Sequence, residues 1–264
     1  MDLPDAPAPP VADPPPAGAD LRRREERPAL PTPGAARAVA FVEVLLCSDY
    51  PTQIIVAQVL AVAGLHAEDG TGALNLTYVA ALTLADTVLL VALIAILLRA
   101  HGEGLRRLLL GERSIGAEFL VGLPLTLVSL AIALIVLGGI QLLAPSLHTV
   151  EHNPLQDLLR TPSGAVVFGV IVVVAGGVRE EIQRAFLLQR FERWLGGATV
   201  GVVVASIAFG AGHLLQGVDA AAATAVLGAF WGVVYLRRRS VVAPMTAHAG
   251  FNLLQVAQFL LIGR

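Results

Sequence analysis

The feature that most constrains this chain is a series of apolar stretches that recur along its length after residue 37. A helix needs about 20 mostly apolar residues to cross the hydrocarbon core of a bilayer. Seven stretches reach or approach that length: 38–65, 73–98, 115–143, 163–183, 197–215, 218–236 and 241–262. Glu43, Asp49 and Pro51 interrupt the first stretch, which we expect either to be kinked or to dip in and out of the membrane. The sequence therefore predicts an all-α fold, a polytopic transmembrane helix bundle of about seven spans.

Composition agrees with a lipid environment and excludes some function classes. Of the 264 residues, 56% are hydrophobic and only 14% are charged, whereas soluble domains average about 25% charged residues. The net charge is −2, so the chain lacks the broad basic field that nucleic-acid binding requires. Cys47 is the single cysteine, which excludes an intrachain disulfide and a thiolate metal site.

The chain divides into a polar tail and an apolar body. Residues 1–36 contain ten prolines and a run of charged residues, and such a segment cannot bury enough apolar surface to offset its ordering entropy. We predict a disordered cytoplasmic tail at 1–36 and a transmembrane helical domain at 37–264. Within that domain, the segment with a functional pattern is 163–262.

Arginine placement predicts the orientation of the spans. Cytoplasmic loops are enriched in basic residues, and the arginines of this chain alternate with acidic loops at successive crossings. The loops at 66–70 and 144–162 are acidic or mixed, and the basic segments carry Arg22, Arg23, Arg24, Arg27 and Arg37, then Arg99, Arg106, Arg107 and Arg113, then Arg237, Arg238 and Arg239. This pattern places the N-terminus in the cytoplasm and predicts a multi-pass protein of a bacterial inner membrane.

Ionisable side chains at membrane depth are costly and usually functional, and the later stretches contain several of them. Three pairs are spaced one helical turn apart, so the members of each pair share a helix face. They are Glu180 with Arg184, Phe209 with His213, and His248 with Asn252, and Glu181 lies beside the first pair. Asp49 and Asp86 are interpreted as protonated carboxyls or as caps of a kink.

The geometry of the pattern suggests a shared site. Stretches 163–183 and 197–215 form a helical hairpin with its turn at Gly196 and Gly197. Glu180 and His213 lie at similar distances from that turn, so they are expected to be level with each other across the hairpin.

These residue types fit hydrolysis by an activated water molecule. A carboxylate beside an imidazole serves as a general base, for which we favour Glu180 with His213. His248 and Asn252 are suited to donate hydrogen bonds to an oxyanion. Glu181 is also a candidate catalytic carboxylate, although we expect it to hold Arg184 or to orient the helix. Phe209 is expected to support His213. The same carboxylates and imidazoles fit a divalent metal, but no His-Glu-x-x-His motif is present, so catalysis without a cofactor is favoured.

The three pairs resemble the motifs of the CPBP family, also called the CAAX-protease and bacteriocin-processing (Abi) family. Its motifs are Glu-Glu-x-x-x-Arg, Phe-x-x-x-His and His-x-x-x-Asn. The last two fit at Phe209–His213 and His248–Asn252, but only two residues separate Glu181 from Arg184, so the motif can be anchored on either the glutamates or the arginine.

The resemblance implies an intramembrane endopeptidase acting on a protein or peptide near the lipid bilayer. Substrates in this family include prenylated C-terminal motifs and bacteriocin leaders. The alternative is a non-enzymatic multi-pass membrane protein, such as an immunity, scaffold or transporter-like protein that retains a relic of the site.

Overall fold

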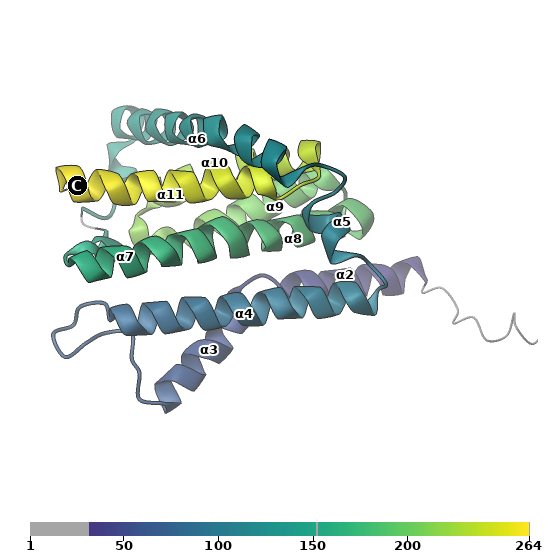
Figure 1. Ribbon diagram of the computed structural model, residues 1–264, viewed down its shortest axis with the longest axis horizontal. Coiled ribbons are helices and arrows are strands. Elements are labelled where there is room, and N and C mark those ends of the chain that lie inside the picture. The colour runs from purple at the N-terminus through teal and green to yellow at the C-terminus, as the bar shows by residue number, and fades with distance from the viewer. Residues whose placement is uncertain (1–31, 152, 264) are drawn as a thin grey trace, which may run out of the picture. The chain divides into compact units, whose positions relative to one another are not determined.

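The computed structural model describes residues 32–151 and 153–263, and this part of the chain is helical without a β-strand (Figure 1). The all-α prediction is therefore confirmed for these residues. The tail predicted at 1–36 lies outside the described residues up to residue 31. Helix α2 (Pro33–Leu46) begins within the bounds expected for that tail.

Four described helices are long and apolar enough to cross a membrane: α4 (Leu76–Ala100), α6 (Ile115–Leu143), α10 (Val218–Arg238) and α11 (Val242–Ile262). A fifth span results if α2 and α3 (Tyr50–Val62), which are bent by 41° at their junction, cross as one unit. The prediction of about seven spans is not confirmed. One reason is α9 (Ala198–Ala211), whose 14 residues extend only about 21 Å, less than the roughly 30 Å of a hydrocarbon core.

The first apolar stretch is interrupted where its polar residues predicted a kink. Helix α2 ends at Leu46 and α3 begins at Tyr50, and between them Asp49 adopts a left-handed backbone conformation with φ 80°. Glu43 on α2 is buried and accepts a hydrogen bond from Arg190 at 2.5 Å. The Glu43 carboxylate therefore lies inside the protein, and the Asp49 side chain is partly buried, at 18% exposed.

The stretch predicted at 163–183 belongs to one continuous helical rod with a wide central part. The rod consists of α7 (Pro162–Ile171), the π-helix η3 (Val172–Arg179) and α8 (Glu180–Trp194). Short π-helical segments within helices are frequent at functional sites. The η3 segment packs against α11, and Gly177 permits the approach, because a Cβ atom there would lie 2.7 Å from the Cβ of Ala249.

The predicted hairpin turn is confirmed. Helix α8 ends at Trp194 and α9 begins at Ala198, and both Gly196 (φ 97°) and Gly197 (φ 96°) occupy the left-handed region that favours glycine. Helix α9 packs against α8 and α10. The short helix η4 (Leu214–Gln216) follows α9.

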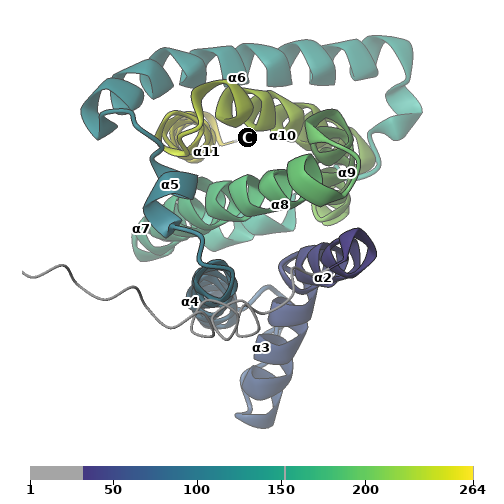
Figure 2. The same cartoon turned by 90° about the vertical axis from the view of Figure 1, so that its right-hand side faces the viewer.

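The helices of residues 37–264 pack around a central group. Seen end-on in Figure 2, α10 and α11 lie between α6 on one side and the α7–η3–α8 rod on the other. Helix α4 packs against the rod from outside, with Leu90 and Ile94 in one apolar cluster with Phe186. The remaining short helices are α5 (Leu105–Leu109), η1 (Pro145–Leu147) and η2 (Pro154–Leu159).

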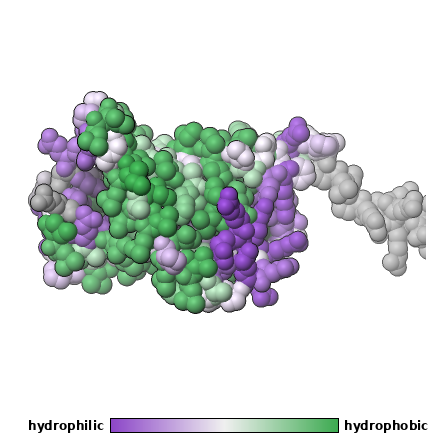
Figure 3. All heavy atoms as spheres, turned by 90° about the horizontal axis from the view of Figure 1, so that it is seen from above, coloured by the Kyte–Doolittle hydropathy of each residue, from purple (hydrophilic) through white to green (hydrophobic). Residues whose placement is uncertain are grey.

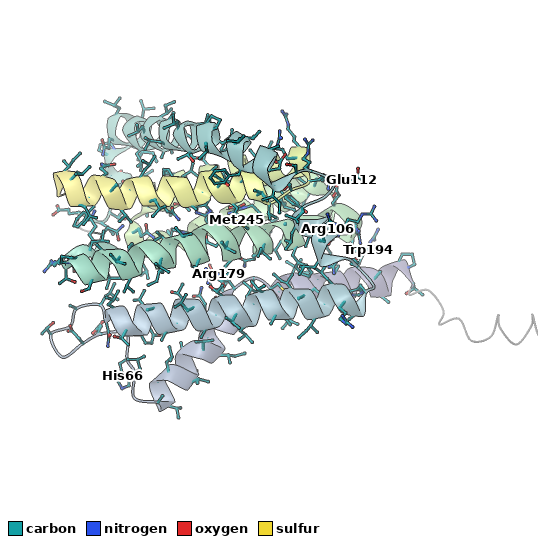
Figure 4. All side chains as sticks on the ribbon, viewed as in Figure 1. His66, Arg106, Glu112, Arg179, Trp194 and Met245 are labelled. Atoms are coloured by element: carbon teal, nitrogen blue, oxygen red, sulfur yellow. The ribbon has the colours of Figure 1, made fainter. Side chains whose placement is uncertain are left out.

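The outer surface is that of an integral membrane protein. Figure 3 shows an apolar belt over the middle of the molecule and hydrophilic side chains at both ends, most densely at one of them. Leu142, Leu143 and Ile135 of α6 are 85%, 88% and 73% exposed, and such extensive apolar exposure indicates contact with lipid. Figure 4 places Arg106 and Glu112 at the polar end.

Candidate active site

Four of the polar residues singled out in the sequence meet at one cavity of about 380 Å³, which is lined by α4, the α7–η3–α8 rod, α10 and α11. Its wall includes Glu180 at the start of α8, His213 just after α9, and His248 and Asn252 on α11. Phe209 lines it too. Glu181 and Arg184 do not line this cavity. The two glutamates, although consecutive in the sequence, therefore have different surroundings: Glu180 faces the cavity and Glu181 does not.

Glu181 is buried, with its side chain 1% exposed. Its Oε1 atom accepts a hydrogen bond from the guanidinium of Arg184, three residues later on the same helix, and lies 2.9 Å from Nδ1 of His248. This carboxylate therefore joins α8 to α11 and fixes the orientation of the His248 ring. The other ring nitrogen of His248, Nε2, is not engaged by Glu181 and is left to face the cavity.

Glu180 is the more accessible carboxylate, with its side chain 14% exposed. Its Oε1 lies 3.3 Å from Nη2 of Arg179, and its Oε2 lies 3.8 Å from Nε2 of His248. The described ion-pair partners of Glu180 are thus Arg179 and His248, and His213 is not one of them. Glu180 and His213 line the same cavity without direct contact, so the direct pairing expected from the hairpin geometry is not seen.

His213 is held by the residue one turn before it. Its Nδ1 atom lies 2.8 Å from the backbone carbonyl oxygen of Phe209, and its ring packs edge-on to the Phe209 ring with 4.8 Å between centroids. Because a carbonyl can only accept, Nδ1 carries the proton in this hydrogen bond. In the neutral ring, Nε2 is then free to accept a proton.

Trp231 on α10 is a site residue that the sequence pattern did not reveal. Its ring stacks on His248 with 3.7 Å between centroids and an interplanar angle of 16°. Its Nε1 donates a hydrogen bond to Oγ of Ser129 on α6, at 3.0 Å. A tryptophan in an apolar helix gives no local signal of such a role, because only the packing of α10 against α11 brings it to the imidazole.

Asn252 lies against the π-helix. Its Nδ2 donates to the carbonyl oxygen of Val172 at 3.4 Å, and a Cβ atom on Gly176 would collide with the same nitrogen. That hypothetical Cβ would also lie 3.6 Å from Nε2 of His248. Glycine at position 176 therefore leaves space beside the two side chains proposed as oxyanion donors.

A second cluster missed by the sequence pattern surrounds Arg179, the last residue of η3. Its guanidinium lies 2.5 Å from Oδ2 of Asp86 on α4, 3.2 Å from Oδ2 of Asp49, and 3.3 Å from Glu180. Figure 4 labels Arg179 between the rod and α4. Asp49 and Asp86, interpreted from sequence as protonated carboxyls or kink caps, share one buried guanidinium that also contacts Glu180. Asp49 also occupies the N-cap position of α3 at the bend after α2. Two acids in apolar stretches were the available signal that a buried cation was needed.

The sequence left open whether the carboxylates and imidazoles bind a divalent metal ion. Over residues 32–151 and 153–263, no group of three or more His, Cys, Asp and Glu side chains is placed to hold a metal ion. Glu180 and His248 approach each other, but Glu181 faces Arg184 on the far side of the ring.

Comparison with known families gives a match over this part of the chain. Residues 162–254 match the family model described as type II CAAX prenyl endopeptidase Rce1-like. These residues form an Rce1-like domain, consistent with the CPBP family. The domain contains every predicted site residue, from Glu180 to Asn252, together with Arg179 and Trp231. No curated protein and no solved structure gives a significant match to the chain.

Proposed function

We propose that this protein is an intramembrane endopeptidase of the CAAX-protease type that hydrolyses a peptide bond by a Glu/His-activated water. The observation that carries the proposal is the convergence of Glu180, His213, His248 and Asn252 on one cavity. These residues lie within the Rce1-like domain. A non-enzymatic relic would not need to keep all four side chains on a common cavity wall.

In the proposed reaction, a water molecule bridges Glu180 and Nε2 of His213, which line the cavity without touching each other. Glu180 accepts a proton as the water oxygen attacks the carbonyl carbon of the substrate. The C–N bond then breaks, and the proton passes to the leaving amine. The hydrogen bond from Nδ1 of His213 to the carbonyl oxygen of Phe209 orients the ring so that Nε2 can hold this water.

Groups on the opposite wall of the cavity are proposed to stabilise the negative charge that develops on the substrate oxygen. Nε2 of His248, when it carries a proton, and Nδ2 of Asn252 are the donors that can stabilise this oxyanion. Glu181 holds the other nitrogen of His248, and Trp231 fixes the plane of the ring by stacking. In this proposal Glu181 is a positioning residue, although the sequence pattern made it a candidate catalytic carboxylate.

The test is cleavage by purified protein in liposomes, using a substrate library that includes farnesylated peptides with a C-terminal C-a-a-X sequence. We expect cleavage by the wild type and a loss of about 10²–10⁴-fold in His213→Ala, as for removal of a general base. His66→Ala, in the exposed loop after α3, is the matched control and should retain activity. Folded wild type that cleaves no substrate in the library would favour the non-enzymatic alternative.

A second prediction concerns metal. If Glu180 and His213 activate water without a cofactor, EDTA should leave the cleavage rate of purified protein unchanged. The measurement is the rate before and after chelation and gel filtration. Loss of activity that one specific divalent ion restores would instead place the protein among metalloproteases.

We further propose that the arginine-rich loops lie in the cytoplasm and that the protein resides in a bacterial inner membrane. The support is the denser group of hydrophilic side chains at one end (Figure 3), together with the tendency of basic loops to remain cytoplasmic. Helix α8 runs from Glu180 toward that end, so the proposed site lies on the membrane side of the cytoplasmic rim.

A further inference from the structure

A second cavity of about 310 Å³ lies beside the first, between the α2–α3 junction, α8 and α9. It shares part of its wall with the first cavity, including Glu180 and His213. The proposed water-activating pair therefore stands at the boundary between two spaces. This arrangement is what a hydrolase needs if the two sides of a scissile bond occupy different pockets.

The two cavities extend in opposite directions from that boundary. The first reaches Phe259 on α11, and the second reaches Phe191 on α8. Phe191 lies 11 residues beyond Glu180, or about 16 Å along the helix, and Phe259 lies a similar distance beyond His248. Helices α8 and α11 run antiparallel (Figure 1), so these two ends lie at opposite ends of the bundle.

Both cavities combine apolar and polar side chains. Away from the catalytic residues, the first is lined by aliphatic and aromatic side chains together with amides and hydroxyls, among them Thr83, Gln156 and Gln255. The second carries hydroxyl and amide side chains of Ser48, Tyr50, Gln53, Gln183 and Gln216. Amides and hydroxyls both donate and accept hydrogen bonds, and this combination suits the N–H and C=O groups of a peptide backbone.

The charged groups of the second cavity contact one another. Asp49 and Glu180 both contact Arg179, and Arg184 is paired with Glu181 behind the wall. A volume near 300 Å³ is at the lower end for ligand pockets, which fits a short segment of peptide.

We propose that the second cavity is a substrate subsite that binds a short peptide segment in extended form on one side of the scissile bond. The first cavity then receives the part of the substrate on the other side. This inference rests on the proposed endopeptidase function and adds the location and chemical class of one subsite. Residues of the α2–α3 junction, which lie outside the Rce1-like domain, become specificity-determining residues.

The test fills the cavity from two walls without touching Glu180 or His213. Ala205→Phe on α9 and Val44→Phe on α2 add bulk inside the cavity. Their matched controls are the outward-facing neighbours Ile207→Phe and Leu45→Phe, which replace side chains that are 64% and 49% exposed. With the cleaved C-a-a-X peptide as substrate, we expect KM to rise at least about tenfold in the first pair and to stay within about twofold in the controls.

A binding measurement keeps this test separate from the test of function. In a Cys47→Ala background with Glu180→Gln, a cysteine introduced at position 205 should react with maleimide, and the same peptide should slow that reaction at least about fivefold. Peptide protection without any cleavage by the otherwise unmodified protein would support the subsite and contradict the protease. Cleavage by the wild type with unchanged KM in both filled variants, or without protection at position 205, would overturn the subsite. A fall in kcat alone would overturn it too, since that indicates a route for water or product.

Discussion

Glu180→Gln is expected to lower the cleavage rate by about 10²–10⁴-fold while leaving the protein folded. Its carboxylate faces the cavity, and its ion-pair partner Arg179 keeps two other carboxylates when the charge at position 180 is removed. Glutamine has the same shape but cannot take a proton from water. The loss should therefore be in kcat, with thermal stability close to that of the wild type.

Glu181→Gln is the matched variant, and it should show the opposite balance. The amide oxygen of glutamine can still accept from Arg184 and from Nδ1 of His248, so the ring keeps its orientation and catalysis falls less. The buried Arg184 loses its charged partner, however, and loss of one member of a buried ion pair is destabilising. We expect a lower unfolding temperature in detergent and a smaller loss of rate.

The comparison requires equal expression and a folding check for both variants, such as gel filtration and thermal unfolding. If Glu181→Gln is inactive while Glu180→Gln cleaves at the wild-type rate, the assignment is reversed. The cavity-facing carboxylate would then be a structural partner of Arg179. Equal losses in both would indicate that the two carboxylates act as one unit with His248.

Arg179→Met is expected to lower the free energy of unfolding by about 3–5 kcal/mol, the cost of leaving buried charge uncompensated. The substitution removes the one guanidinium that Asp49, Asp86 and Glu180 share. Asp86 is fully buried, so it cannot recover solvation by water. The measurement is chemical or thermal unfolding in mixed micelles, followed by tryptophan fluorescence.

Two control variants define the cause of this loss. Asp86→Asn removes one of three carboxylates from around a single cation and should cost much less than Arg179→Met. The double variant Arg179→Met with Asp86→Asn should recover part of the lost stability, which a double-mutant cycle measures directly. Arg160→Met, at a pair whose arginine side chain is 71% exposed, should change stability by less than about 1 kcal/mol. An additive double variant would contradict a shared electrostatic cause.

Local patterns in the sequence determined the helical class, the hairpin turn and most of the candidate site. Hydrophobic periodicity requires only near neighbours, so the bounds predicted for α6, 115–143, agree with the structure. The turn at Gly196 and Gly197 was readable because positive φ angles favour glycine. The pair His248 and Asn252 was visible because it lies within α11, and the pair Phe209 and His213 because the chain keeps the one-turn spacing just past the end of α9.

The tertiary structure decided which groups face each other. The sequence placed Glu180 level with His213, but side-chain direction depends on rotation about the helix axis. The π-helix η3 alters that rotation just before α8, and a repeat of 3.6 residues does not predict such a segment. Span count was also beyond local pattern, because the apolar stretches at 163–183 and 197–215 became a long rod and a 14-residue helix.

Long-range packing supplied the residues that the sequence could not assign. Asp49, Asp86 and Arg179 lie far apart along the chain. Trp231 lies on α10 and His248 on α11, so only the packing of these two helices brings their rings together. Sequence alone showed that buried acids need partners, since an isolated charge at membrane depth costs several kcal/mol (about 2.5–3.5 on insertion scales). Which arginine pairs with which carboxylate depends on the packing of α4 and the α2–α3 junction against the rod. That packing is a property of the folded bundle.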